Sequence, residues 1–223
     1  MDDIFENAPD FIDPAARDLV TVTGPDAASY LHSQLAQDVH DLPVGETRWT
    51  FVLEPTGKVD VLARVTRTAD DTFVLDTDAG FGEALADRIN RFKIRVQADV
   101  EVTPAATTDP TEDHEAARIA AAWPRMGAEI VPEDTIPATT GIVEQAVSFT
   151  KGCYPGQELV ERMHSRGAEA PRSLRIVDVG DGAAAGDPVL DGGAEVGTIT
   201  SVAGGRALAY VKRGSDAGTA PTR

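Results

Sequence analysis

Turn-forming residues divide this chain into short segments, and this constrains its fold more than any other feature. The 223 residues include 20 Gly and 14 Pro, which end helices and mark turns at close intervals. Many of the segments between them alternate apolar and polar residues, as half-buried strands do. A bundle of long helices is therefore disfavoured. Because 42% of the residues are hydrophobic, a chain of this length can bury about 70% of its unfolded surface, which argues against disorder.

The N-terminal part of the chain predicts an antiparallel sheet with two helices. Gly24-Pro25-Asp26 separates an apolar strand from a stretch with helical spacing, and Pro is well suited to the first turn of a helix. Turns at 54–58 and 70–71 separate three strands, which are simplest to pair as antiparallel neighbours. The predicted strands are 19–23, 47–53, 59–68, 72–76 and 94–102, and the predicted helices are 27–35 and 82–92.

The pattern changes after residue 103. Residues 103–113 are rich in Pro, Thr and Asp without periodicity, which predicts a linker. Helices are predicted at 112–123 and 155–166, an extended segment at 147–151, and short alternating strands at 173–179, 196–202 and 206–211. We therefore expect one region over residues 1–170 and a small all-β module over residues 171–223.

The acidic charge of the chain limits its partners. Twenty Lys and Arg against 37 Asp and Glu give 20 − 37 = −17, a net charge that repels phosphate backbones and anionic lipids. The acidic first residues contain no apolar core of a secretory signal, and no stretch reaches the roughly 18 apolar residues of a membrane span. We expect a cytoplasmic protein without direct nucleic-acid or membrane binding.

The chain has one cysteine, Cys153, and four histidines that are spread along it. A single cysteine permits neither an internal disulfide nor a C-x-x-C zinc site, and the histidines show no ligand spacing. No ligand set for a metal centre within this chain is visible, and the sequence leaves the oligomeric state open.

Two further groups have alternative interpretations. Trp49 and Trp123 are interpreted as core aromatics rather than as stacking platforms. Four cations lie within eight residues of this otherwise acidic chain, and they either hold an anionic tail or form a solvated face, as charge runs usually do. These four are Arg88, Arg91, Lys93 and Arg95.

The densest group of reactive residues is the segment Lys151-Gly152-Cys153-Tyr154-Pro155-Gly156-Gln157-Glu158, which is followed by Arg162 and His164. A thiol just before a helix start and two residues from an ammonium group is placed to favour its thiolate form. The flanking glycines allow a close approach of the backbone to a ligand. The alternative is a buried cysteine that only packs.

This segment resembles the signature K-G-C-[FY]-x-G-Q-E of the YgfZ family, folate-binding relatives of the glycine-cleavage T-protein (aminomethyltransferase). The similarity extends over nearly the whole chain, from the opening strand and helix through Leu53-Glu54-Pro55-Thr56-Gly57-Lys58 to the C-terminal strands. The resemblance implies an α+β fold, with a T-protein-like folate-binding region of antiparallel sheets and packed helices and a small C-terminal β-barrel.

The same resemblance implies a tetrahydrofolate-binding factor, or one for another reduced folate, that supports the assembly or repair of iron-sulfur proteins. Its partners would be iron-sulfur client proteins or assembly factors, with an indirect effect on tRNA modification. The functional thiol would be Cys153, with Lys151 beside it. The residues expected to bind the cofactor are Lys58, Tyr154, Gly156, Gln157, Glu158 and Arg162.

The sequence differs from the family pattern at three places, and these differences bear on which function is expected. The linker 103–113 is short where longer relatives carry an extra segment of the cavity wall. Ala120 stands where relatives often carry a Glu that reads the pterin ring, and the acidic pair of the aminomethyltransferase becomes Asp60-Val61. We therefore expect a factor without conventional enzymatic activity.

Three alternatives stay open. The first is a tetrahydrofolate-dependent aminomethyltransferase or another one-carbon transferase, which needs a carboxylate such as Asp60 beside the folate. The second is a thiol-dependent transferase that uses Cys153 with His164 as base. The third is a scaffold that retains the fold without folate.

Overall fold

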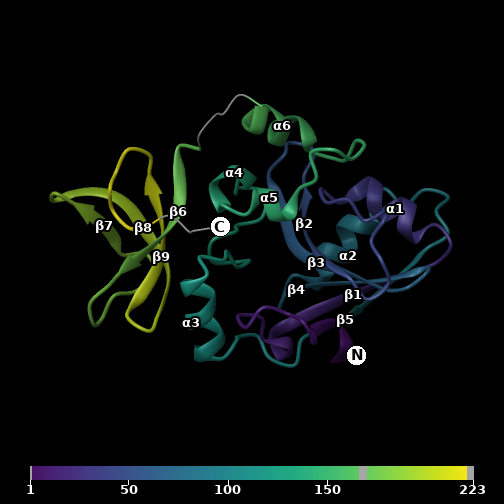
Figure 1. The fold of residues 1–223 in the computed structure, drawn as a ribbon, viewed down its shortest axis with the longest axis horizontal. Helices are drawn as coiled ribbons and strands as arrows, with labels where there is room; N and C mark the ends of the chain where they lie inside the picture. Colours follow the sequence, from purple (N-terminus) through teal and green to yellow (C-terminus); the bar gives the residue numbers. More distant parts are fainter. Residues whose placement is uncertain (1, 166–169, 220–223) are drawn as a thin grey trace.

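A computed structural model describes residues 2–165 and 170–219 and contains two antiparallel sheets (Figure 1). The larger sheet has the strand order β2-β3-β4-β1-β5, and all its neighbouring strands are antiparallel. The adjacency of β2, β3 and β4 confirms the predicted three-stranded arrangement. The strands are β1 (Arg17–Thr23), β2 (Thr47–Leu53), β3 (Val59–Ala69), β4 (Thr72–Asp78) and β5 (Asp99–Thr103).

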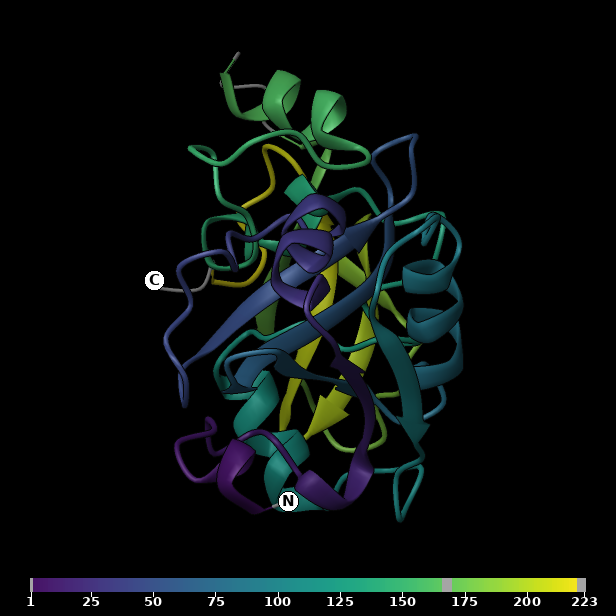
Figure 2. The ribbon, with the colours of Figure 1, turned by 90° about the vertical axis from the view of Figure 1, so that its right-hand side faces the viewer.

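Two helices pack against one face of the larger sheet, α1 (Ala27–Gln34) and α2 (Gly82–Asn90) (Figure 2). Leu31 of α1 and Leu85 and Ile89 of α2 are completely buried there. The spacing of Leu85 and Ile89 puts both on one side of the helix. Burying a side chain of this kind contributes about 1.5–3 kcal/mol relative to leaving it exposed, so this cluster holds the helices on the sheet.

Helices α5 (Val143–Ala146) and α6 (Gln157–Ser165) contribute to a second apolar cluster, which includes Phe51 and Leu62 of the sheet. Helix α4 (Pro137–Thr140) packs beside α5 and α6. The predicted helix 155–166 is confirmed over most of its length, although it begins two residues later, and Arg166 lies outside the described residues. The segment that carries Cys153 enters α6 and is therefore attached to the sheet through this cluster.

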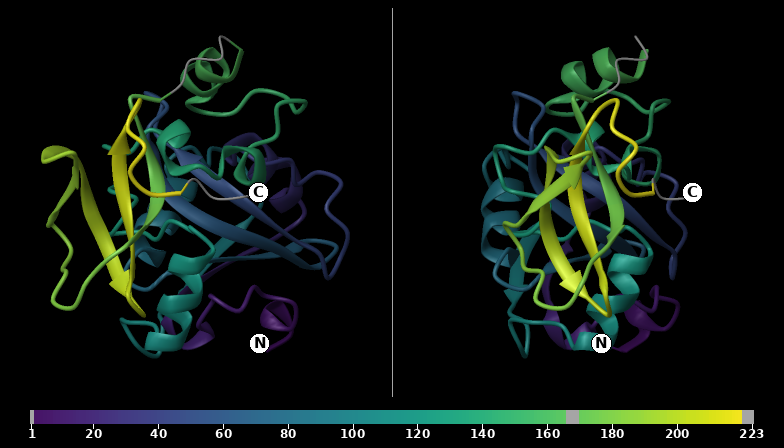
Figure 3. Two further views of the ribbon diagram at one scale, coloured as in Figure 1. Left: turned by 60° about the vertical axis from the view of Figure 1, so that its left-hand side comes forward. Right: turned by 90° about the vertical axis from the view of Figure 1, so that its left-hand side faces the viewer.

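The smaller sheet has the order β6-β9-β8-β7, from strands β6 (Arg172–Asp178), β7 (Pro188–Asp191), β8 (Ala194–Ala203) and β9 (Arg206–Lys212). Helix α3 (Glu112–Ala120) lies beside it, and Ile119 is buried against Leu174 and Leu208 (Figure 3). The two sheets lie on either side of the predicted boundary at residue 171, and the division into two regions stays a prediction.

A buried polar network joins the smaller sheet to the rest of the chain. Arg118 of α3 donates hydrogen bonds to Glu129 and to Ser201 of β8, both at 2.7 Å. Ser201 Oγ donates to Glu129 at 2.6 Å, and the Tyr210 hydroxyl of β9 donates to the Glu129 carbonyl at 2.9 Å. Because these buried groups satisfy one another's hydrogen bonds, the network fixes the smaller sheet relative to α3 and the segment that carries Glu129.

Two predicted strands differ from the observed structure. Of the predicted strand 94–102, only residues 99–102 pair with β1, as part of β5 (Asp99–Thr103). Residues 94–98 form a loop instead, because Lys93 Nζ donates to the Ala98 carbonyl at 2.8 Å and Arg95 adopts a left-handed backbone with φ of 59°. The predicted extended segment 147–151 forms no strand, although the Ser148 amide donates to the Ala36 carbonyl. Strand β7 and helices α4 and α5 were not predicted, since four residues are too few to show a period.

None of the helices in the described part of the chain is long and apolar enough to cross a membrane.

Candidate functional site

The signature segment, residues 151–158, packs its backbone directly on the β2–β3 hairpin. A Cβ atom at Gly156, where φ is +80°, would lie 2.5 Å from the Glu54 carbonyl oxygen and 3.0 Å from Gly57 Cα. At Gly57, where φ is +87°, a Cβ atom would lie 2.4 Å from Cβ of Leu159. Only glycine tolerates both the conformation and the contact. The two family motifs therefore form one structural unit.

Lys151 holds the other end of this segment. Its Nζ donates to the carbonyl oxygens of Leu35 at 2.6 Å, of Gln37 at 3.2 Å and of His32. Burial lowers the pKa of this ammonium group to about 8, against a smaller opposing effect of Asp38. All three N–H bonds are engaged by carbonyls in the last turn of α1 and in the loop after it. The structure thus gives Lys151 an anchoring contact, and its predicted role beside the thiol stays a prediction.

Cys153 is exposed at the surface. The alternative of a buried cysteine that only packs is therefore wrong. The predicted position just before a helix start is also wrong, because α6 begins at Gln157, four residues later. The Gln157 side chain instead accepts a hydrogen bond from the Tyr154 amide at 3.0 Å, which orders the intervening turn. The thiol thus projects from a loop whose backbone is fixed on both sides.

The other predicted site residues lie around this loop, and none of them is among the residues that line the aromatic cavity described below. Tyr154 is buried, and burial raises the pKa of its hydroxyl to about 12. Glu158 and Arg162 are exposed on α6, and Lys58 forms a 3.9 Å ion pair with Asp134. The predicted binding roles of Lys58, Tyr154, Gly156, Gln157, Glu158 and Arg162 stay predictions.

His164 has other partners than the cysteine. Its ring stacks on Phe149 at a centroid distance of 3.7 Å, and Nδ1 lies 3.6 Å from a Glu144 carboxylate oxygen. These contacts give no support to His164 as the base for Cys153.

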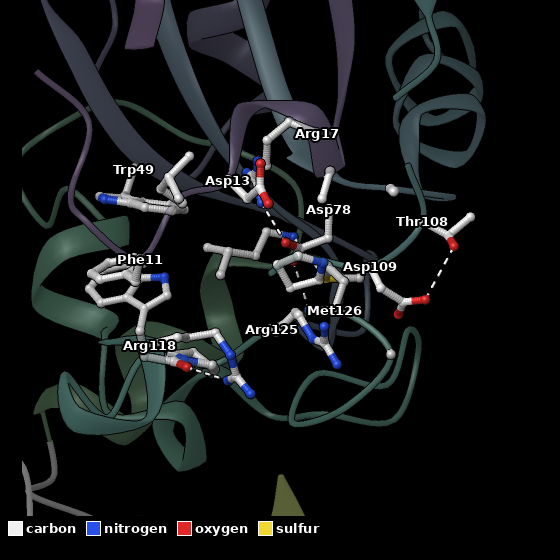
Figure 4. Close-up of a pocket in the computed structure, with 18 residues that line it drawn as sticks. Phe11, Asp13, Arg17, Trp49, Asp78, Thr108, Asp109, Arg118, Arg125 and Met126 are labelled. Carbon is white, nitrogen blue, oxygen red and sulfur yellow. Dashed lines mark hydrogen bonds and ion pairs between the residues drawn. The ribbon is translucent and has the colours of Figure 1, made fainter. Parts of the chain in front are cut away.

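A cavity of about 240 Å³ lies between the larger sheet, the N-terminal segment and the turn after α3 (Figure 4). We call it the aromatic cavity. Its wall combines aromatic rings with charged groups from five separate parts of the chain. The lining residues include Phe11, Asp13, Arg17, Trp49, Leu62, Asp78, Thr108, Asp109, Pro110, Arg118, Trp123, Arg125 and Met126.

Three rings meet in this cavity. Trp49 and Trp123 lie 4.6 Å apart between centroids, and Phe11 stacks on Trp123 at 5.3 Å. Both tryptophans are only partly buried, and both also pack against the second apolar cluster. The core interpretation was therefore incomplete, because the same rings present an aromatic wall to the cavity. Sequence offered no signal for this meeting, since the three residues are far apart along the chain.

The charged groups of the cavity are mostly committed to one another. Arg17 donates to Asp76 at 2.8 Å and to Asp78 at 2.5 Å, and Asp78 also accepts the Met126 amide at 2.9 Å. Arg125 differs, because its Nε has no hydrogen-bond partner among the described residues and its closest ion pair, with Glu115, is 3.8 Å long. Arg125 is thus the guanidinium most available to an anionic ligand.

The linker 103–113 contributes a wall of this cavity. β5 ends at Thr103 and α3 begins at Glu112, so the loop between them places Thr108, Asp109 and Pro110 at the cavity. Ala120 is exposed at the end of α3 and is not a lining residue. The short linker therefore forms part of the wall of this cavity, and the expectation that it leaves part of a folate-cavity wall missing stays a prediction.

Asp60 turns away from the aromatic cavity. β2 and β3 shift register between Val52 and Leu53, which leaves Asp60 as the extra residue of a β-bulge. Its carboxylate lies 3.9 Å from the buried Arg88 of α2, and burial, followed by the neighbouring Glu54, raises the pKa of Asp60 to about 6. The carboxylate that a one-carbon transferase would need is therefore not supplied to the cavity by Asp60.

No group of three or more His, Cys, Asp and Glu side chains within 2–165 and 170–219 is arranged to hold a metal ion.

Comparisons with known proteins found similarities in both parts of the chain. Residues 172–220 match the family model of the CAF17 C-terminal beta-barrel domain. An uncharacterized protein of Haemophilus influenzae is 28% identical over 196 residues, covering 71% of this chain and 70% of that protein. Two mitochondrial iron-sulfur cluster assembly factor IBA57 homologs, from Pyricularia oryzae and Chaetomium globosum, are 26% identical and cover 73% and 84% of this chain. The chain spans only 56% and 60% of the lengths of these two relatives.

The solved structure of glycine cleavage system aminomethyltransferase T from Bartonella henselae shows the same fold. It matches with a TM-score of 0.76 and 17% identity, covering 90% of this chain and 77% of that chain. The predicted fold class is confirmed, while the narrower assignment to the YgfZ family stays a prediction. The chain therefore combines the T-protein fold and a CAF17-type C-terminal barrel with sequence similarity to IBA57 homologs.

Proposed function

We propose that this protein is an assembly factor for iron-sulfur proteins and that Cys153 is its working group. The similarity to two IBA57 homologs supports the process, and the exposed thiol on an anchored loop supports the residue. The single observation that carries the proposal is this exposure of Cys153, because a signature cysteine that only packed would be buried.

One thiolate cannot bind a cluster alone, because a cluster is normally held by four protein ligands. We propose that Cys153 supplies one ligand, or one sulfur contact, while a client protein or another assembly factor supplies the rest. Glycine at position 152 supports this role, since nothing lies within 4 Å of a Cβ atom placed there and a partner can approach the backbone closely. Enzymes that modify tRNA would be affected only indirectly, as clients. We further propose that the protein works in the cytoplasm.

We also propose that the aromatic cavity holds the ring system of a reduced folate. Aromatic walls suit a flat heterocycle, and Arg125 suits a carboxylate of its tail. The fit is partial, because about 240 Å³ is below the roughly 300–1,000 Å³ of a pocket that encloses a drug-sized ligand. Most of the tail would therefore lie outside. When bound, the folate could carry a one-carbon unit, but Asp60 faces away and supports no transfer step.

Complementation tests the proposed function. Cells without this gene should lose the activity of enzymes that contain [4Fe-4S] clusters, and wild-type protein should restore it. We expect Cys153→Ser at equal protein level to restore less than about a tenth of that activity. Gly180→Ala lies outside the signature segment and places its Cβ atom where nothing lies within 4 Å, so it is the matched control and should restore all of it. Full restoration by the serine variant would reject the role of the thiol.

Calorimetry with tetrahydrofolate tests the cavity. We expect weak binding by the wild type and at least about a tenfold loss in Arg125→Ala, since hydrogen bonds to charged groups contribute about 1.5–3 kcal/mol. Ala120→Glu should not strengthen binding, because residue 120 does not line the cavity. Equal heats for the wild type and Arg125→Ala would remove folate from the proposal and leave the thiol untouched.

A further inference from the structure

The loop after α2 leaves two large apolar side chains exposed between cations. Ile94 is 78% exposed and Phe92 is 43% exposed, and both are among the most exposed large hydrophobic residues of the described chain. Arg91 and Arg95 on either side are also exposed. Exposed apolar side chains that gather in one place mark interaction surfaces more often than isolated ones do.

The loop is ordered without a partner. Lys93 Nζ and the Ala98 carbonyl close it at 2.8 Å, the Ile94 amide donates to the Phe92 carbonyl at 2.9 Å, and the Gln97 amide donates to Asp26 at 2.8 Å. A surface that is already fixed loses little conformational entropy when it binds.

The cations of this loop are unequal. Arg88 is buried inside the protein, where it donates to the Leu53 carbonyl at 2.9 Å, and its guanidinium lies 4.9 Å from the Phe92 ring centroid. Arg91 forms one ion pair, with Glu54 at 3.2 Å. Arg95 forms no ion pair within the described ranges. The predicted cluster thus divides into one internal cation, Arg88, a second, Lys93, that closes the loop, and two cations that face outward.

This surface adjoins the signature segment. Arg91 pairs with Glu54, and the Glu54 carbonyl is the group against which Gly156 packs. A protein bound across the loop after α2 would therefore be close to the hairpin and to the segment that carries Cys153. In a chain with a net charge of −17, a local positive and apolar surface selects for a complementary acidic one.

We propose that Arg91, Phe92, Ile94 and Arg95 form a docking ridge for an acidic, apolar segment of the protein on which Cys153 acts. This inference rests on the proposed function, for which it supplies the partner contact. Nucleic acid and anionic lipid fit poorly, because two outward arginines cannot offset the repulsion from the rest of the chain.

Photo-crosslinking in cells tests the ridge. The probe is p-benzoylphenylalanine at position 94 of the full chain, and the control carries it at Leu190, another exposed aliphatic residue (61%), which precedes an acidic residue, Asp191. We expect a protein adduct at position 94 alone, with the crosslinked peptide rich in Asp or Glu. Arg91→Glu with Arg95→Glu should reduce the adduct at least about tenfold. Arg95→Glu alone, which breaks no ion pair, should reduce it in part and guards against misfolding.

The outcomes separate this inference from the proposed function. If Cys153→Ser abolishes cluster-enzyme activity while the adduct is unchanged, both stand. If the adduct forms and depends on the arginines but the enzymes are normal in cells without the gene, the ridge stands and the proposed function fails. No adduct above the Leu190 control, an adduct indifferent to both arginines, or an adduct with nucleic acid, lipid or a second copy of this chain overturns the ridge.

Discussion

The signature segment and the aromatic cavity satisfy their polar groups in opposite ways. In the signature segment the backbone is anchored by Lys151 and by Gly156, while the thiol of Cys153 is exposed to solvent. The cavity is lined by several segments that are distant in sequence, and its residues Arg17 and Arg118 donate hydrogen bonds to Asp78 and Glu129. In the loop the backbone is fixed and the functional group is exposed. In the cavity most of the charged side chains bind other parts of the protein and so stabilise the fold.

This difference shows where chemistry is possible. A side chain whose donors are all taken by buried partners stabilises the fold and has little left for a ligand. Arg125 is the exception in the cavity, and it lies beside an aromatic wall, an arrangement that suits a flat ring with one anionic contact. We therefore propose that the loop carries the activity and that the cavity supports it.

A substitution in the buried polar network around Glu129 should give the largest effect on stability. Glu129→Ala removes the acceptor of Arg118 and Ser201 and leaves a buried guanidinium with one carboxylate fewer. We expect a loss of about 3–5 kcal/mol in the free energy of unfolding, measured by urea denaturation. Glu195→Ala, an exposed position on β8, is the control and should change it by less than about 0.5 kcal/mol. Similar losses in Glu129→Ala and Glu195→Ala would show that Glu129 does not hold a buried polar network together.

Alanine substitutions at two glycines test whether the signature segment is held on the β2–β3 hairpin. Gly156→Ala forces a side chain into a left-handed backbone and onto the Glu54 carbonyl, so we expect at least about 2 kcal/mol of destabilisation. Gly152→Ala meets nothing within 4 Å and has no such backbone conformation. Thermal unfolding of the two variants measures the contrast. Equal stability would mean that the segment is not held on the hairpin.

Removing the ammonium group tests the other anchor. Lys151→Met leaves the carbonyls of Leu35, Gln37 and His32 without their donor, for an expected cost of about 1–2 kcal/mol. Hydrogen exchange should rise in the loop after α1 and in the signature segment together. The matched variant Lys58→Met loses only a 3.9 Å surface pair and should leave exchange unchanged. Faster exchange in only one of the two segments would contradict the bridge.

The Asp60 bulge predicts a smaller effect that depends on pH. The pKa of Asp60 rises from an ordinary 3.8 to about 6, so the folded state keeps this proton to a higher pH than the unfolded state does. Its stabilising contribution is complete below about pH 4 and is lost as the pH rises through about 6. Urea denaturation should show this loss in the wild type relative to Asp60→Asn. Parallel pH curves for the two proteins would contradict the raised pKa.

Local patterns predicted the larger sheet well because turn residues mark the ends of its apolar segments, although β1 and β3 are buried along most of their length. The predicted strand 47–53 has the same bounds as β2. The same pattern failed at 94–98, because alternation of Ile94 and Val96 does not reveal that Lys93 closes a turn on the Ala98 carbonyl. A hydrogen bond from a side chain to the backbone is not visible in apolar periodicity.

The candidate site was predicted in part for a similar reason. The motif identified Cys153, whose exposure the structure confirms, but the role of Lys151 depends on carbonyls more than a hundred residues away. The cavity depends on Phe11, Trp49 and Trp123 meeting in space. Such meetings are set by the tertiary fold, and single-sequence reasoning reaches them only through a known relative.

We propose a division of roles in which the loop with Cys153 carries the assembly activity and the aromatic cavity only supports it. It is tested most directly by measuring [4Fe-4S] enzyme activity in cells whose only copy of this protein is Cys153→Ser or Arg125→Ala, at equal protein levels. We expect less than about a tenth of the wild-type activity with Cys153→Ser and at least half with Arg125→Ala. Wild-type activity with Cys153→Ser, or a greater loss with Arg125→Ala, would contradict the claim.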